Sequence, residues 1–135
     1  MRLWHYKLIP YLPKNQLCGQ WRECCCIAKN ISENGTPNHI LVNKIMNYPM
    51  EHFYHYGYIV FKEMKARNYK VDWNKFDKWF SRIWTTGEYD ISLFPRWHND
   101  RYLKQCLYNL QEKADCGGIP ESTWQKIHYE FMWEL

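Results

Sequence analysis

The chain has 135 residues, of which 24% are charged, 46% are hydrophobic and 19% are aromatic, and its formal net charge is +4. This length is typical of one domain, here residues 1–135, which is large enough to bury roughly two thirds of the surface of its unfolded chain. The mild positive charge permits a nucleic-acid partner without requiring one. No apolar run reaches the roughly eighteen residues of a membrane-spanning helix, and the first ten residues lack the apolar core of a secretion signal. We therefore expect a protein of the reducing cytoplasm that does not associate with membranes.

The cysteines do not follow a metal-binding pattern. Cys24, Cys25 and Cys26 are consecutive, so on a helix they point in three directions and cannot form one ligand set. No pair of the Cys-x-x-Cys type occurs elsewhere, and thiols need not pair in a reducing compartment. We therefore expect no metal and no cofactor, and interpret the cysteines mainly as small buried hydrophobic residues. A redox-active or metal-binding cysteine protein is the alternative to this interpretation.

The N-terminal part of the chain predicts an extended segment followed by a long helix. Pro10 and Pro13 disfavour helix in the residues that precede them, so residues 1–11 are expected to be extended. A helix is predicted from Lys14 to Asn30, with Pro13 in its first turn, where the missing N–H costs nothing. The apolar stripe of this helix consists of Leu17, Trp21, Cys24, Ala28 and Ile31.

The middle of the chain predicts a loop and a second long helix. Residues 34–38 read Asn-Gly-Thr-Pro-Asn and must form a loop. Residues 39–46 are a short apolar stretch, compatible with a brief helix or an irregular turn. The second helix is expected from Met50 to Arg67, and Asn68 suits the left-handed position that ends a helix.

The C-terminal part predicts three further helices and no strand. Strict alternation of apolar and polar residues does not persist anywhere, so the predicted fold is all-α: a compact bundle of about five helices with an extended N-terminal segment docked among them. Residues 88–98 are expected to form an irregular connection. The first predicted helix runs from Trp73 to Trp84 and is capped by Asp72. The second runs from Asp100 to Ala114 and is capped by Asn99 or His98, with Lys113 facing outward and Leu103, Leu107 and Leu110 facing inward. The last helix opens at Pro120 and continues to the C-terminus.

Two features are candidates for a site, namely the acid Glu23 on the first long helix and the α-amine of the first residue; the alternatives are a solvated helix carboxylate and a frayed terminus. Glu23 lies off the apolar stripe, and because helical side chains lean toward the N-terminus it is expected to lie over Gly19, which leaves open space. The α-amine of Met1 belongs to a class with a lower reference pKa than a Lys side chain, so it can act as a nucleophile near neutral pH. Large apolar residues after Met1, including Leu3 and Trp4, favour docking of this segment rather than fraying.

These residues resemble a known family. Gln16-Leu17, followed after a four-residue gap by Arg22-Glu23 and preceded by the opening Met-Arg-Leu-Trp-His, is similar to the pyrimidine dimer DNA glycosylases typified by phage endonuclease V. The later Lys65-Ala-Arg-Asn-Tyr-Lys-Val71 turn also fits the order of elements in that family. The first residues and the Arg-Glu-Cys-Cys segment most resemble a bacterial branch of it.

The resemblance implies a mechanism. The N-terminal amine attacks C1′ of a damaged nucleotide and displaces the base, and the glutamate at the position of Glu23 stabilises the cationic sugar and moves protons. The resulting imine allows the DNA backbone to break by β-elimination, which is the AP-lyase step. Because Arg2 is bulky, Met1 is expected to be retained and to supply the amine itself.

The resemblance also implies the DNA contacts. Arg2 and Arg22 would hold phosphates beside the lesion, Gln16 would make a polar contact, and Lys126 belongs to a C-terminal aromatic segment similar to the family's lesion-contacting tail. A family arginine is replaced here by Cys26, and a family histidine is replaced by Gln16. The expected partner is double-stranded DNA that carries a base lesion, bound by a monomer associated with the nucleoid. A non-catalytic nucleic-acid-binding helical module would need only the basic and aromatic residues, and is the alternative function.

Overall fold

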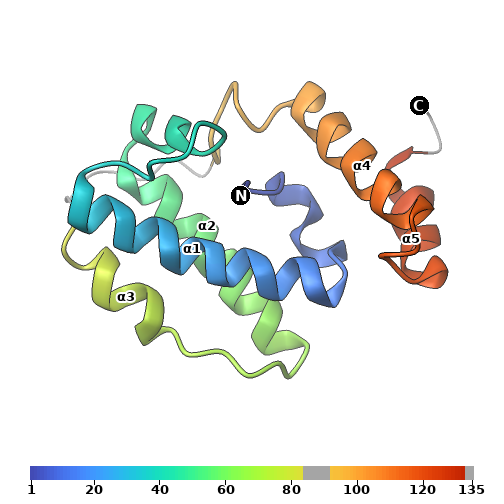
Figure 1. Cartoon of the computed structure of the whole chain (residues 1–135), viewed down its shortest axis with the longest axis horizontal. Coiled ribbons are helices and arrows are strands. Elements are labelled where there is room, and N and C mark those ends of the chain that lie inside the picture. The colour runs from blue at the N-terminus through green and yellow to red at the C-terminus, as the bar shows by residue number, and fades with distance from the viewer. Residues whose placement is uncertain (84–91, 133–135) are drawn as a thin grey trace.

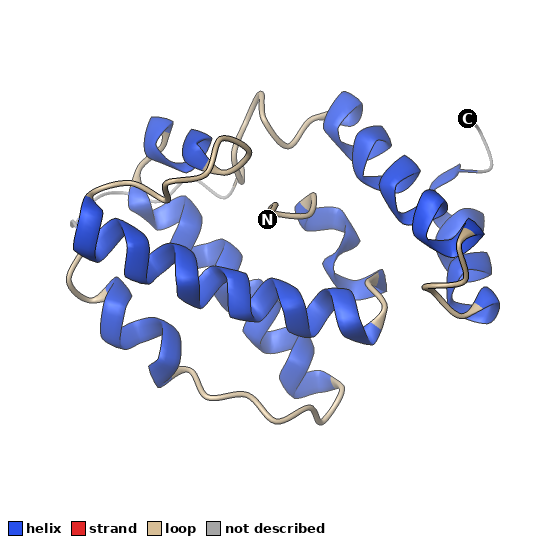
Figure 2. Ribbon diagram, in the orientation of Figure 1, coloured by secondary structure: helices blue, strands red, loops and turns tan. Residues whose placement is uncertain are grey.

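The computed structural model describes residues 1–83 and 92–132, and all regular structure within these ranges is helical. This confirms the predicted all-α fold (Figures 1 and 2). In chain order the elements are η1 (Tyr6–Tyr11), α1 (Lys14–Asn34), η2 (Asn43–Asn47), α2 (Met50–Ala66), α3 (Asn74–Phe80), α4 (Asp100–Asp115), α5 (Glu121–Ile127) and η3 (His128–Met132).

The N-terminal segment is docked among the helices, as predicted. It lies between the layer formed by α1 and α2 and the helix α4 (Figure 1), and Leu3 is fully buried while Trp4 is 5% exposed. The expectation of an extended chain throughout residues 1–11 was wrong beyond the fifth residue, because η1 is a 3-10 helix. The His5 side chain accepts a hydrogen bond from the backbone N–H of Lys7 and thereby caps its first turn.

The helix α1 extends to Asn34 rather than to the predicted Asn30. Gly35 follows it with φ of 76°, and its N–H donates to the carbonyl of Ile31 at 2.8 Å. A glycine in the left-handed conformation is a common helix end, so the stop signal lies at Gly35 and not earlier. The predicted apolar stripe is buried in full: Leu17, Trp21, Cys24, Ala28 and Ile31.

The end of α2 follows the prediction, whereas the bounds of α3 do not. Asn68 has φ of 61° just after α2. The helix α3 begins at Asn74, one residue later than predicted, with Trp73 rather than Asp72 at the cap position. The Asp72 carboxylate still accepts a hydrogen bond from the backbone N–H of Asn74 at 3.0 Å. The helix α3 ends at Phe80, after which residues 81–83 form turns. The predicted end at Trp84 lies outside the described residues. Short helices of this kind are stabilised mainly by packing, here against α1 and α2.

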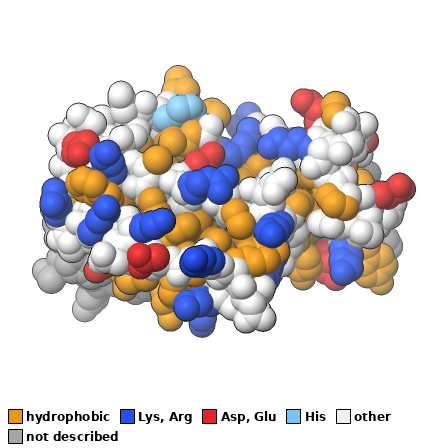
Figure 3. Space-filling view, turned by 60° about the horizontal axis from the view of Figure 1, so that its bottom comes forward, with side chains coloured by type: hydrophobic (Ala, Val, Ile, Leu, Met, Phe, Trp, Pro, Cys, Tyr) orange, Lys and Arg blue, Asp and Glu red, His pale blue; other side chains and the backbone are white. Residues whose placement is uncertain are grey.

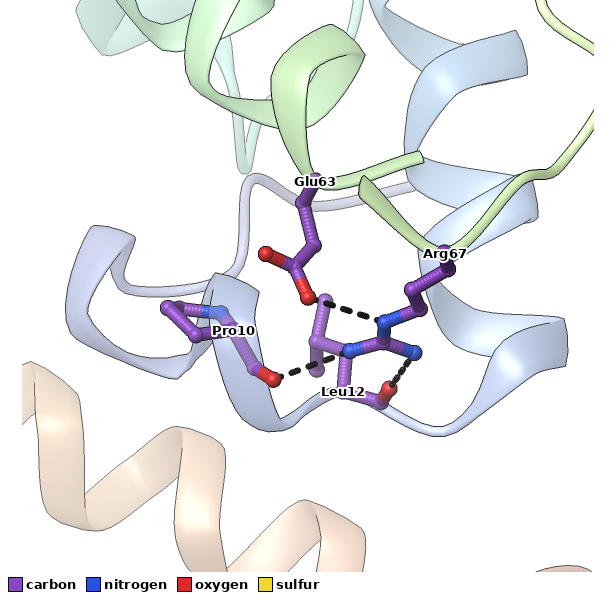
Figure 4. Close-up of polar contacts among 4 residues, drawn as sticks. All are labelled: Pro10, Leu12, Glu63 and Arg67. Carbon is purple, nitrogen blue, oxygen red and sulfur yellow. Dashed lines mark hydrogen bonds and ion pairs between the residues drawn. The ribbon is translucent and has the colours of Figure 1, made fainter. Parts of the chain in front are cut away.

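One arginine fastens the end of α2 to the N-terminal segment. The Arg67 guanidinium contacts the Glu63 carboxylate at 2.9 Å and donates to the carbonyls of Leu12 at 2.7 Å and Pro10 at 3.0 Å (Figure 4). This is the one ion pair found within residues 1–83 and 92–132. Arg67 therefore fixes the junction between η1 and α1.

The C-terminal helices match the prediction except at the end. The Asn99 side chain accepts a hydrogen bond from Tyr102 N–H at 2.9 Å, as expected for the cap of α4. Leu107 and Leu110 are buried, but Leu103 is only half-buried. After α5 the chain changes to a π-helical turn, η3, where a continuing α-helix was predicted. Residues 92–98 are irregular as expected, and residues 88–91 fall outside the described part.

The cysteines are less uniformly buried than predicted. Cys24 and Cys106 are buried, whereas Cys26 and Cys116 are exposed, and the six thiols are all free. In the described ranges, no group of three or more His, Cys, Asp or Glu side chains is placed to hold a metal ion. None of the helices in these ranges combines the length and the hydropathy that crossing a membrane requires.

Candidate active site

A small pocket of about 240 Å³ lies where the N-terminal segment meets α1 and α4. Four of the six residues that the sequence nominates for the site line it, namely Met1, Arg2, Gln16 and Glu23. The remaining lining residues are Trp4, Asn15, Gly19, Gln20 and Lys113.

Glu23 is half-buried beside the beginning of the chain. Its Oε2 accepts hydrogen bonds from the backbone N–H of Arg2 at 3.4 Å and from Gln20 Nε2 at 3.3 Å. Covalent geometry keeps successive backbone nitrogens within about 3.7 Å of each other, so the Met1 nitrogen lies within roughly 7 Å of this oxygen. Both hydrogen bonds fall on Oε2, and a carboxylate has about four lone-pair sites, so Glu23 keeps lone pairs for a further partner.

Gln20 joins the N-terminal segment to α1, and the sequence interpretation missed it. This side chain is 1% exposed. Its Oε1 accepts from the backbone N–H of Trp4 at 2.7 Å and from Tyr56 Oη at 2.9 Å, and its Nε2 donates to the Arg2 carbonyl at 2.9 Å. Gln20 stands four residues before Cys24 on the buried side of α1, and a polar residue at such a position signals a satisfied internal network.

The opposite side of the segment is held by residues near α4. Tyr102 Oη donates to the Leu3 carbonyl at 2.6 Å, and Tyr6 N–H donates to His98 Nδ1 at 3.1 Å. Burial lowers the pKa of His98 to about 2 and that of His5 to about 4. Both imidazoles are therefore neutral at pH 7, as their roles as hydrogen-bond acceptors require.

Two cations stand at Trp4, on the edge of the pocket. The Arg2 guanidinium carbon and Lys113 Nζ each lie 5.3 Å from the centroid of the Trp4 ring. The sequence placed Lys113 only on the outer face of its helix, because nothing local predicts that α4 comes beside the first residues. The combination of one carboxylate and two cations suits a phosphate-bearing substrate.

The other two nominated residues lie outside the pocket. Arg22 is exposed, and its Nη2 would lie 3.8 Å from a Cβ added at Gly19. Glu23 was expected to lie over this glycine, but the Arg22 guanidinium is the group found closest to it. Lys126 lines a separate cavity of about 530 Å³, which shares Asn15 and Gln16 with the small pocket. The buried Oε1 of Gln16 has no hydrogen-bond partner in the described part of the chain.

One of the three comparisons with known proteins found a match. The model of the family described as pyrimidine dimer DNA glycosylase matches residues 1–77, more than half of the chain. No curated protein and no solved structure matches the sequence. The matched region contains every residue of the pocket except Lys113. The chain therefore belongs to the pyrimidine dimer DNA glycosylase family, which is a family of DNA-repair glycosylases.

Proposed function

We propose that this protein is a DNA glycosylase with AP-lyase activity that acts through the amine of Met1 and the carboxylate of Glu23. Family membership supplies the glycosylase activity at the level of the family. The observation that supports these two residues is that they line one pocket, with the N–H of Arg2 bonded to Glu23 Oε2. The proposed substrate is double-stranded DNA that carries a pyrimidine dimer or a related base lesion.

The proposed reaction has two stages. The lone pair of the unprotonated amine forms a bond to C1′ as the glycosidic bond breaks, and the base leaves with the bond electrons and takes up a proton. The adduct loses its amine proton and opens the sugar ring at O4′, which is protonated, to give an imine. Removal of a proton from C2′ then expels the 3′ phosphate oxygen by β-elimination. Water hydrolyses the remaining imine and returns the free amine.

Glu23 suits the charge that develops in both stages. A carboxylate near an oxocarbenium-like sugar stabilises the transition state more than the ground state, and this difference lowers the barrier. Its unused lone pairs leave acceptor capacity to move protons at O4′ and C2′. We assign it both roles.

The proposed DNA contacts come from the cations around the pocket. Arg2 and Lys113 are assigned to phosphates beside the lesion, because they flank Trp4 at the edge of the pocket. Arg22 is assigned to the DNA phosphates that pass Gly19, and Gln16 to a polar contact with the DNA. Lys126 is assigned to DNA farther from the lesion. The free thiols of the chain support work in a reducing cytoplasm, where we expect a monomer at the nucleoid.

The test compares Glu23→Gln with Glu33→Gln, which changes an exposed glutamate farther along the same helix. Base release and strand cleavage are measured on ultraviolet-irradiated duplex with protein of native N-terminus. Loss of a general acid-base typically lowers turnover by about 10²- to 10⁴-fold, so Glu23→Gln should fall in this range and Glu33→Gln should stay within about twofold. Turnover of Glu23→Gln equal to that of the wild type would remove this residue from the mechanism.

A second arm blocks the amine. Protein that carries extra residues before Met1 should bind irradiated duplex with nearly the wild-type affinity but should release no base, because the nucleophile is now an amide. Full turnover by the extended protein would reject the amine as nucleophile while leaving glycosylase activity itself in place.

A further inference from the structure

A further concave surface, separate from the pocket and from the cavity at Lys126, lies on the other side of α1 from the pocket. It is a groove of about 460 Å³ between α1 and the segment that leads into α3. Its rim carries the exposed cations Arg22, Lys70 and Lys75, and the one carboxylate among its lining residues is Asp72, which accepts a hydrogen bond from the N–H of Asn74 at the start of α3. The groove therefore presents a net positive charge to solvent.

The positive charge continues from the groove along α3. Lys29 Nζ, Lys78 Nζ and the Arg82 guanidinium carbon lie 5.5, 5.4 and 5.0 Å from the centroid of the Trp79 ring. These cations are exposed and none of them belongs to the single ion pair of residues 1–83 and 92–132. Like charges gathered on one ring repel one another, and binding of a polyanion would relieve that repulsion.

One residue of α1, Arg22, connects the groove with the pocket. Arg22 borders the groove on one side and reaches Gly19, which lines the pocket, on the other. An α-helix with its side chains is about 10–12 Å across, whereas one turn of duplex DNA is about 34–36 Å long. A duplex that presents a sugar to the pocket on one side of α1 is therefore long enough to reach the groove on the other side. Figure 3 shows Lys and Arg side chains spread over the side of the molecule that carries α3.

We propose that the groove and the cations on Trp79, together called the α1–α3 basic face, bind the phosphate backbone of the duplex that flanks the lesion. The proposal rests on the proposed function, because it takes DNA as the partner. Each phosphate that the face neutralises releases condensed counterions, which adds affinity without sequence preference. The face thus holds undamaged DNA on one side of α1 while the pocket works on the other.

The first test uses two exposed free cysteines as probes. Cys26 lines the groove, whereas Cys116 follows α4 and lies outside it. The wild-type protein is alkylated with iodoacetamide, with and without a saturating undamaged duplex, and the rate at each thiol is followed by peptide mass spectrometry. The duplex should slow alkylation of Cys26 by at least fivefold and change that of Cys116 by less than twofold. Equal rates at Cys26 with and without the duplex would overturn the proposal.

The second test measures the salt dependence of duplex binding for Lys75→Gln/Lys78→Gln. Each lost phosphate contact reduces the slope of log K against log salt by about 0.9, so this variant should lose roughly 1.8. The matched control is Lys7→Gln/Lys104→Gln, which removes the same charge from exposed positions on η1 and α4 and should keep the wild-type slope. Equal slopes for both variants would reject the face, because net charge alone would then explain any loss.

Base release by the wild-type protein separates this proposal from the proposed function. Release of the base together with an unchanged slope for Lys75→Gln/Lys78→Gln means that the face is wrong and the glycosylase assignment stands. A reduced slope in a protein that releases no base means that the face binds DNA and the catalytic proposal fails.

Discussion

Replacing Gln20 by Met removes the side chain that fastens the first residues to α1 while nearly preserving its volume. In the wild type, Gln20 accepts from Trp4 N–H at 2.7 Å and donates to the Arg2 carbonyl at 2.9 Å. Tyr56 Oη keeps a second partner in the Trp4 carbonyl at 2.6 Å, so the variant leaves two backbone groups without a partner. Each unsatisfied buried group costs about 1–3 kcal/mol, and Arg2 is partly solvated, so the expected loss is about 2–4 kcal/mol.

This loss has two readouts. For a domain of this size 1 kcal/mol corresponds to roughly 4 °C in the unfolding midpoint, so Gln20→Met should melt about 8–16 °C below the wild type, followed by circular dichroism. Base release measured well below that midpoint should also fall, because the first residue is no longer held beside Glu23. The control is Gln125→Met, an exposed glutamine of α5, which should melt within about 2 °C of the wild type. A Gln20→Met protein with the wild-type midpoint and full base release would refute the role of this side chain.

Three further predictions concern the fold. Gly57→Ala should lower the unfolding free energy by about 1–3 kcal/mol, because the added Cβ would lie 2.9 Å from the Phe76 ring. Gly19→Ala should raise it by up to about 1 kcal/mol, because the added Cβ has room and alanine favours the helix. Urea denaturation measures both changes, and a more stable Gly57→Ala than Gly19→Ala would contradict the packing. Arg67→Lys should lower the unfolding free energy by about 1–3 kcal/mol in the same assay, because one ammonium group cannot reproduce the three contacts of the planar guanidinium with Glu63, Leu12 and Pro10. A loss below about 0.5 kcal/mol would contradict the stabilising role of Arg67. The unfolding free energy should fall by roughly 1–2 kcal/mol for each of the imidazoles of His5 and His98 as the pH is lowered from 7 to 5. Their native pKa values of about 4 and about 2 lie below the value in the unfolded chain, so the unfolded chain takes up protons first as the pH falls. Urea midpoints at the two pH values measure the change, and a protein that is more stable at pH 5 would contradict it.

Local signals predicted the helices well and their ends less well. The buried stripe of α1 and the cap Asn99 follow from spacing and side-chain chemistry within a few residues. Asp72 was predicted to cap α3 and lies one residue before the cap position. The helix η1 was not predicted because Pro10 disfavours an α-helix. Backbone hydrogen bonds between residues three apart, such as Leu8 N–H to the His5 carbonyl, still fold this segment as a 3-10 helix. The π-helical turn after Ile127 leaves no local sign, because the last residues are as apolar and as helical in pattern as those before them.

The site divides in the same way. The pairing of Met1 with Glu23 was implied by the resemblance to the family, and both residues line one pocket. Gln20 and Lys113 were missed for different reasons. Gln20 lies on the buried side of α1, and its role depends on hydrogen-bond partners in a distant segment, such as the N–H of Trp4. Lys113 lines the pocket because α4 packs beside the first residues, and no residue close to Lys113 in the sequence predicts that packing. Contacts between distant segments therefore limit what this sequence predicts.

In the proposed reaction the first nitrogen of the chain becomes bonded to the sugar of DNA. Protein of native N-terminus is incubated with duplex that contains an abasic site, reduced with borohydride and digested, and the adduct is located by mass spectrometry. The expected product is a stable amine that joins C1′ to the nitrogen of Met1. An adduct on a lysine side chain, or no adduct from protein that still binds the duplex, would contradict it.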